Sequence, residues 1–326
     1  MAENSIAFVF PGQGSQKVGM LAAAYERFDA VRDAFREASE ALGYDMWLLV
    51  QNGEQTALNL TETTQPVLLT SSVALWRAWQ ASGGARPGIM AGHSLGEFSA
   101  LVCAGSLGFT DAVRLVRQRG EFMQSAVPVG EGAMAAIIGL EDEVINATCA
   151  DVAARGDGVV AAVYFNSPGQ VVIAGQTAAV DAAIEALKAA GAKRAMPLPV
   201  SAPFHTALMK PAGERLAEAI AGVSIGAPDI PVVHNVHART EPDPERIRGL
   251  LVEQIYSPVQ WTACVEAMVG RGCSSIVECG PGKVLSGLNR RIDKSLQSFS
   301  LEEPDALDAA LQALGAHNDS SEENSR

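Results

Sequence analysis

The pentapeptide Gly92-His93-Ser94-Leu95-Gly96 constrains the fold of this chain more than any other feature. It lies between a short apolar run, Ile89 to Ala91, and a stretch typical of a helix, Glu97 to Val102. In a strand–turn–helix of the form G-x-S-x-G, the serine takes a strained backbone conformation and exposes its hydroxyl. The helix N-terminus then directs free N–H groups at whatever reacts there. Ser94 is therefore a candidate nucleophile, although a simple helix N-cap, with Glu97 completing a capping box, also fits.

The pattern elsewhere predicts an α/β protein. Ile6 to Phe10 is typical of a buried strand, and the glycine-rich loop after it carries Gln13 beyond the strand's carboxyl end, where open α/β sheets bind ligands. Helical spacing of apolar residues predicts one helix from Leu21 to Leu42, ended by Gly43. Pro66 is expected to open a second helix that continues from Val67 to Trp79.

The pattern changes between residues 128 and 199, where strands and helices alternate in the order βαββαβ. This order is typical of a ferredoxin-like unit, with Asp142–Ala154 as its first helix. We expect a ferredoxin-like insertion at 128–199 in a discontinuous catalytic domain formed by residues 1–127 and 200–315. Residues 316–326 are polar and rich in serine and glutamate, which predicts a disordered tail.

Composition excludes several classes of function. The 326 residues carry a net charge of −13, which argues against nucleic acid or an anionic membrane surface as the main partner. No apolar stretch approaches the roughly 20 residues of a membrane span. The five cysteines form no C-x-x-C pair, and their odd number suits a reducing compartment, so we expect a cytoplasmic protein. No metal-ligand motif is present in the sequence.

Arg119 is the most informative charge in the chain. Its neighbours at helical spacing are all apolar, namely Leu115, Val116, Phe122 and Met123. An arginine directed into a core is costly unless an anion meets it, so Arg119 is a candidate clamp for a substrate carboxylate. A snorkelling side chain or an internal salt bridge are the alternatives.

A serine nucleophile needs a base, and His205 is the best placed of the five histidines. It lies on a loop between Pro203 and the start of a helix, where a rigid backbone can aim the ring. His93 follows Gly92 on the tight turn and is expected to face away from Ser94. His234 and His237 flank a buried strand, where core or surface roles are the better interpretation.

Taken together, these motifs resemble the malonyl-CoA:acyl carrier protein transacylases. The resemblance runs in order from about residue 6 to 310 and is carried by Pro11-Gly12-Gln13-Gly14-Ser15-Gln16, Gly92-His93-Ser94-Leu95-Gly96-Glu97, Arg119-Gly120, Phe165-Asn166-Ser167-Pro168-Gly169-Gln170, Pro199-Val200-Ser201 with His205, Gln254 with Pro258-Val259-Gln260-Trp261, and Gly280-Pro281-Gly282-Lys283-Val284-Leu285.

The resemblance implies an α/β-hydrolase-like core with a parallel sheet, together with the ferredoxin-like insertion. It implies Ser94 as nucleophile, His205 as base oriented by the Gln254 carbonyl, and an oxyanion hole formed by the Leu95 N–H and Gln13. Arg119 would bind the malonyl carboxylate, and Met123, Asn166 and Phe204 would line or orient the pocket.

The implied reaction moves a malonyl group from malonyl-CoA through a malonyl-serine to the phosphopantetheine thiol of acyl carrier protein, for fatty-acid elongation. No bound cofactor is implied, because the coenzyme A thioester is itself the substrate. A serine thioesterase or esterase of the same core, or a catalytically silent docking module for carrier proteins, are the alternatives. Intact Ser94, His205 and Gln13 disfavour the docking module, and the buried arginine disfavours the esterase.

Three places depart from the family's usual pattern. Tyr164 stands where asparagine is common, His234 and His237 replace residues of an Asn-Asn-Val-Asp-like stretch, and Phe204 replaces a small serine. A phenylalanine before the histidine resembles malonyl-selective acyltransferase domains of polyketide synthases. We therefore expect Phe204 to narrow the pocket against α-branched malonyl groups.

Carrier proteins are acidic, as this chain is, so docking needs a local basic patch. Two sets of residues could supply it: Lys188, Lys193 and Arg194, or Lys283, Arg290, Arg291 and Lys294.

Overall fold

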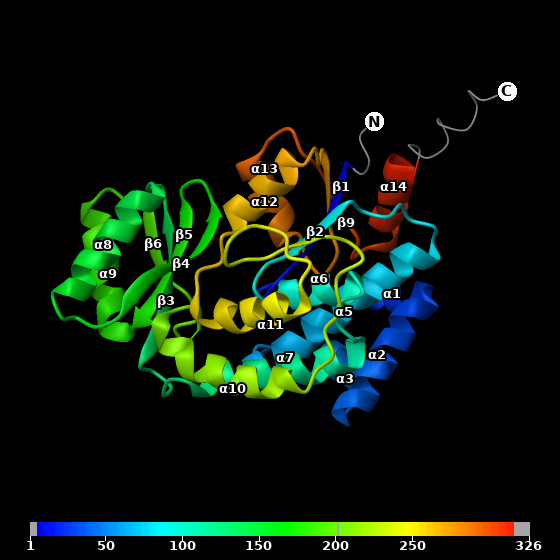
Figure 1. Cartoon of the computed structure of the whole chain (residues 1–326), viewed down its shortest axis with the longest axis horizontal. Coiled ribbons are helices and arrows are strands. Elements are labelled where there is room, and N and C mark those ends of the chain that lie inside the picture. The colour runs from blue at the N-terminus through cyan, green and yellow to red at the C-terminus, as the bar shows by residue number, and fades with distance from the viewer. Residues whose placement is uncertain (1–4, 201, 316–326) are drawn as a thin grey trace.

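The computed structural model describes residues 5–200 and 202–315, which form two sheets with helices packed around them (Figure 1). The larger sheet has five parallel strands in the order β7-β2-β1-β8-β9. Numbered along the chain within this sheet, the order is 3-2-1-4-5, a doubly wound arrangement that binds ligands at the carboxyl ends of its strands. Its strands are β1 (Ile6–Phe10), β2 (Ile89–Gly92), β7 (Val232–Val233), β8 (Ser275–Glu278) and β9 (Gln297–Ser300).

Helices cover both faces of this sheet, so β1 is buried on both sides. Ile6, Phe8 and Phe10 enter one hydrophobic core, whereas Ala7 and Val9 enter another. A strand whose alternate residues face two cores must be apolar throughout, as this one is. The helices around the larger sheet are α1 (Ala22–Arg27), α2 (Asp29–Leu42), α3 (Met46–Asn52), α4 (Gln55–Leu58), α5 (Thr61–Ala81), α6 (Leu95–Cys103), α7 (Phe109–Ser125), α10 (Lys210–Ala221), α11 (Pro244–Glu253), α12 (Trp261–Gly270), α13 (Val284–Ile292) and α14 (Pro304–Gly315), with 3₁₀ turns η1 (Ala207–Met209) and η2 (Gln254–Tyr256).

Two of the predicted helices are wrong in their limits. The single helix expected from Leu21 to Leu42 is broken at Phe28, whose backbone is extended. Pro66 does not open its helix, because α5 begins five residues earlier, at Thr61. Tertiary packing outweighs the proline's preference: a Cβ on Gly120 of α7 would lie 2.6 Å from the Thr61 carbonyl oxygen, so α7 holds this first turn closely.

The smaller sheet confirms the predicted order βαββαβ. It comprises β3 (Gly132–Ile138), α8 (Asp142–Ala154), β4 (Val160–Ser167), β5 (Gln170–Gln176), α9 (Thr177–Ala189) and β6 (Arg194–Pro197). The strands are antiparallel in the order β4-β5-β3-β6. Helices α8 and α9 pack on one face through a hydrophobic core of their own, and β3, β4 and β5 contribute other residues to a core of the larger unit.

Backbone hydrogen bonds join the two units beside the carboxyl end of the larger sheet. Phe165 N donates to the Val259 carbonyl at 3.1 Å, and Val259 N donates to the Val163 carbonyl at 2.8 Å. No helix within the described ranges is long and apolar enough to cross a bilayer. The tail predicted at 316–326 lies outside the described residues, as does Ser201.

Candidate active site

The turn between β2 and α6 puts Ser94 in a strained conformation, with φ of 49° and ψ of −106°. Both flanking glycines are required by close approach. A Cβ on Gly92 would lie 1.8 Å from the Gly96 carbonyl carbon, and a Cβ on Gly96 would lie 2.0 Å from the Phe10 carbonyl oxygen. A strained serine persists only where its surroundings hold it, and here Ser94 N donates to Asn235 Oδ1 at 2.8 Å.

Ser94 is paired with His205 rather than with its own helix. Its side chain makes no capping bond, and Ser94 Oγ lies 2.8 Å from His205 Nε2. The capping-box interpretation is therefore wrong: Glu97 bonds to Asn235, Gln254 and His234 instead.

The environment of His205 assigns its tautomer. Its Nδ1 faces two carbonyl oxygens, that of Gln254 at 2.7 Å and that of Ser257 at 3.2 Å, so Nδ1 carries the proton and donates. Nε2 is then left to accept the Ser94 hydroxyl. Burial, reinforced by the Arg119 charge, lowers the pKa of His205 to about 3, so the imidazole is neutral and able to act as a base.

Arg119 of α7 reaches the same hydroxyl. The residue is 1% exposed, and its NH2 group donates to Ser94 Oγ at 3.2 Å and to Gln254 Oε1 at 2.9 Å, while NH1 donates to Gln65 Oε1 at 2.8 Å. Burial lowers the pKa of Arg119 to about 10, which still leaves it charged at neutral pH. Within the described residues it forms no ion pair, and Nε has no partner. Snorkelling and an internal salt bridge are both wrong for this residue.

A small cavity of about 40 Å³ lies where these groups meet, lined by Gln13, Gln65, His93, Ser94, Leu95, Arg119, Met123, Tyr164, Phe204 and His205. An adjoining cavity of about 380 Å³ shares Gln13, Tyr164 and Phe204 with it and continues along Met134 of β3 and along Leu198 and Val200, which follow β6. The serine therefore lies at the inner end of a partly apolar passage between the two units.

The remaining predicted residues lie in or beside the small cavity. Gln13 is exposed at its mouth, and Leu95 belongs to the first turn of α6, where backbone N–H groups have no partner inside the helix. Asn166 does not point freely into the cavity, because its Oδ1 bonds His93 Nε2 at 2.8 Å. The His93 ring bonds Asn166 and makes no hydrogen bond to the Ser94 side chain, although His93 is among the residues that line the cavity.

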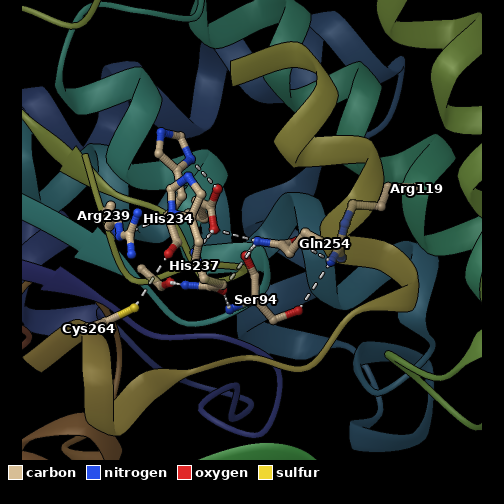
Figure 2. A network of polar contacts seen from close by, with 10 residues as sticks. Ser94, Arg119, His234, His237, Arg239, Gln254 and Cys264 are labelled. Carbon is tan, nitrogen blue, oxygen red and sulfur yellow. Dashed lines mark hydrogen bonds and ion pairs between the residues drawn. The ribbon is translucent and has the colours of Figure 1, made fainter. Parts of the chain in front are cut away.

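Sequence reasoning missed the polar residues behind the serine. Glu97, His234, Asn235 and the side chain of Gln254 form a buried hydrogen-bonded group, drawn in Figure 2. One signal was available, because Glu97 is the only charged residue in the helix Leu95–Cys103. Among residues 5–200 and 202–315, no cluster of three or more His, Cys, Asp or Glu side chains could hold a metal ion.

Comparisons with known proteins agree on one group. A family model described as an acyl transferase domain matches residues 7–303. The malonyl CoA-acyl carrier protein transacylase of Salmonella typhimurium is 58% identical over 305 residues, covering 94% of this chain and 98% of that protein. Its namesake from Bacillus subtilis is 44% identical over 316 residues, covering 97% and 99%.

Solved structures give the same picture. An acyl carrier protein S-malonyltransferase from Vibrio cholerae superposes with a TM-score of 0.92 at 56% identity, covering 94% of this chain and 99% of that one. A malonyl-transacylase in complex with its type II PKS acyl-carrier protein superposes with a TM-score of 0.93 at 53% identity, covering 94% and 99%.

Proposed function

The chain belongs to the malonyl CoA-acyl carrier protein transacylase family, and from this we propose that Ser94, His205 and Arg119 carry out its malonyl transfer. The activity is transfer of the malonyl group from malonyl-CoA to acyl carrier protein, which supplies fatty-acid synthesis. The family uses no cofactor, and malonyl-CoA is a substrate. The contact of 2.8 Å between Ser94 Oγ and His205 Nε2, with Arg119 on the same oxygen, is the observation that carries the assignment of residues.

In the first half-reaction, Ser94 Oγ attacks the thioester carbonyl while His205 Nε2 takes its proton, forming a malonyl-serine and releasing coenzyme A. The Gln254 carbonyl holds the imidazole in the required tautomer, where other enzymes use a carboxylate. The Leu95 N–H and Gln13 would stabilise the oxyanion, a contribution of about 3 kcal/mol per donor.

Arg119 would select the acyl group. A malonyl carboxylate can accept hydrogen bonds from two donors of Arg119. One is the Nε–H, which has no partner in the described part of the chain, and the other is the NH2 group that donates to Ser94 Oγ in the free protein. Acetyl offers no carboxylate to this buried charge. In the second half-reaction, the phosphopantetheine thiol of acyl carrier protein attacks the malonyl-serine, with His205 acting on that thiol.

Of the two basic patches, the one formed by Lys283, Arg290, Arg291 and Lys294 is better placed to dock the acidic carrier. The loop before α13 lies against the loop that carries Gln13, since a Cβ on Gly282 would be 3.8 Å from the Ser15 carbonyl oxygen. Arg291 also bonds Gln170 at the start of β5, so α13 lies beside the smaller sheet. In the other patch, by contrast, Lys188 is already paired with Glu185.

We also propose the finer description of the fold and its cellular setting. The order β4-β5-β3-β6 supports a ferredoxin-like insertion at 128–199, and the strand–serine–helix turn supports an α/β-hydrolase-like core formed by 1–127 and 200–315. An acyl carrier protein of fatty-acid synthesis as partner supports a cytoplasmic location.

The test is a two-step labelling experiment. Labelled malonyl-CoA should label Ser94, and added acyl carrier protein should then receive the label. Ser94→Ala should abolish labelling, whereas Ser99→Ala, which removes a buried hydroxyl five residues further along the chain, in α6, should retain it. Label that reaches the carrier from the Ser94→Ala variant would overturn the assignment, and label lost to water would indicate a thioesterase.

A further inference from the structure

Glu97 is a buried carboxylate that the proposed reaction does not use. It lies one helical turn after Ser94 on α6 and has no solvent exposure. Its carboxylate faces away from the cavity, towards a strand end and a 3₁₀ turn that lie far away in the sequence. Figure 2 shows that Gln254 lies between Arg119 on one side and His234 on the other.

Three N–H groups converge on this carboxylate. His234 Nδ1 lies 2.7 Å from Oε1, while Asn235 N and Gln254 Nε2 donate to Oε2 at 2.9 and 2.8 Å. We call Glu97, His234, Asn235 and Gln254 the Glu97 network. All four side chains have no exposure, so each lost acceptor would leave a buried donor without a partner.

The network fixes which end of the Gln254 amide faces Arg119. The nitrogen Nε2 faces only acceptors, namely Glu97 Oε2, the Ser94 carbonyl at 3.1 Å and Asn235 Oδ1 at 3.2 Å. The oxygen Oε1 is therefore turned the other way and accepts from Arg119 NH2 at 2.9 Å. An amide flipped end for end would present N–H groups to a guanidinium, which cannot accept them.

We infer that Glu97 is a positioning residue that acts through Gln254: it holds the amide oxygen towards Arg119 and so sets the guanidinium in the orientation that selects malonyl. This inference rests on the proposed role of Arg119. It reaches the base as well, because the Gln254 backbone carbonyl accepts from His205 Nδ1.

Charge supports the same role. Arg119 is buried without an ion pair in the described part of the chain, and Glu97 lies behind the amide that bonds it. Burial lowers the pKa of Arg119, and Tyr164 and the Glu97 charge oppose this lowering. Glu97 also lies in the first turn of α6, at the positive end of the helix dipole.

A purely structural anchor would behave differently from a positioning residue. It would weaken loading of every acyl group alike by loosening the turn at Ser94. A residue that orients Arg119 must change the preference between acyl groups, because only malonyl uses the guanidinium.

The experiment measures kcat/KM for loading of Ser94 from malonyl-CoA and from acetyl-CoA, and takes their ratio. Glu97→Leu, which keeps the volume and removes every acceptor, should lower this ratio about tenfold or more, a size common for coupling within one hydrogen-bonded network. Glu97→Gln should lower it about fivefold. If the amide oxygen of the introduced glutamine accepts from Gln254 Nε2, its NH2 group faces His234 Nδ1. His234 Nδ1 could then accept only if the ring proton moved to Nε2, which is buried without a partner in the described residues.

Glu278→Gln is the matched control. Glu278 is also fully buried, but its carboxylate accepts from Leu285 N and from Ser286 at the start of α13 and touches none of the proposed catalytic groups. This variant should lower the unfolding temperature and leave the ratio unchanged.

A folded Glu97→Leu with a ratio within about twofold of the parent would overturn the inference, and Glu97→Gln carries the same test if the leucine variant does not fold. In an Arg119→Ala background, neither Glu97 change should alter the ratio further. If Arg119→Ala alone leaves the ratio unchanged, the proposed role of Arg119 fails and the inference fails with it; if it changes the ratio and Glu97→Leu does not, only the inference fails.

Discussion

Replacing Arg119 with alanine tests the origin of acyl selectivity. The change removes the only arginine or lysine among the described residues that line the small cavity, and it leaves the amide oxygens of Gln65 and Gln254 without their donor. Malonyl and acetyl groups differ at the carboxylate alone, so the variant should separate recognition of that carboxylate from the acyl-transfer chemistry at Ser94.

The size of the effect follows from the hydrogen bonds available. Two donors of Arg119 can meet a malonyl carboxylate, the Nε–H and the NH2 hydrogen now on Ser94 Oγ. A hydrogen bond to a charged group contributes about 1.5–3 kcal/mol. The loss is therefore about 3–6 kcal/mol, or about 10²–10⁴ in kcat/KM at 1.36 kcal/mol per tenfold. Water entering the truncated site will recover part of it, so we expect a fall of about 100-fold for malonyl.

The assay compares loading of Ser94 from malonyl-CoA and acetyl-CoA for Arg119→Ala and for Arg117→Ala. Arg117 lies two residues earlier on α7 and pairs with Glu121 on the exposed face, so its loss should leave both rates unchanged. Acetyl loading by Arg119→Ala should hold or rise. A malonyl-to-acetyl ratio within about threefold of the parent would refute the reasoning, because the loss of two hydrogen bonds to a charged group should change the ratio by more than this.

Phe204, His205 and the basic patch that contains Lys283 and Lys294 give three further expectations. Phe204→Ser should raise loading from methylmalonyl-CoA relative to malonyl-CoA, because Phe204 lines both cavities; unchanged selectivity would contradict this. Since burial and Arg119 lower the pKa of His205 from its usual 6.5 to about 3, the base stays neutral as pH falls, and kcat/KM for loading should hold from about pH 8 to about pH 5. A loss centred near 6.5 would count against it. Lys283→Glu with Lys294→Glu should raise KM for acyl carrier protein and leave loading from malonyl-CoA unaltered; an unchanged KM would exclude docking there.

Local pattern predicted the smaller sheet well. The helix Asp142–Ala154 was predicted with the limits that the structure gives, and the order βαββαβ is confirmed. Each of these elements is short, ends at a turn and packs against neighbours in the same stretch of chain, so its sequence holds most of the information that forms it.

Prediction failed where a contact distant in sequence outweighs a local preference. Pro66 looks like a helix start, but α7 packs so closely on Thr61 that the helix begins before it. Ser94 and Glu97 match a capping box, yet Ser94 Oγ bonds His205 and Arg119, and the Glu97 carboxylate bonds residues more than a hundred positions away. A local motif does not reveal that residues distant in sequence will provide the hydrogen-bond partners in the folded protein.

Charged residues on apolar helical faces show both the reach and the limit of sequence reasoning. Arg119 and Glu97 each interrupt an apolar face, and both lie near Ser94. Arg119 bonds the amide oxygen of Gln254, and Glu97 bonds its amide nitrogen. Glu278 is equally buried at the end of an apolar strand, but it satisfies the first N–H groups of α13. Burial of a charge therefore indicates only that a partner exists. Whether that partner is a helix end or a reacting group depends on which strands lie side by side, and the order β7-β2-β1-β8-β9 brings His234 and Asn235 to Glu97.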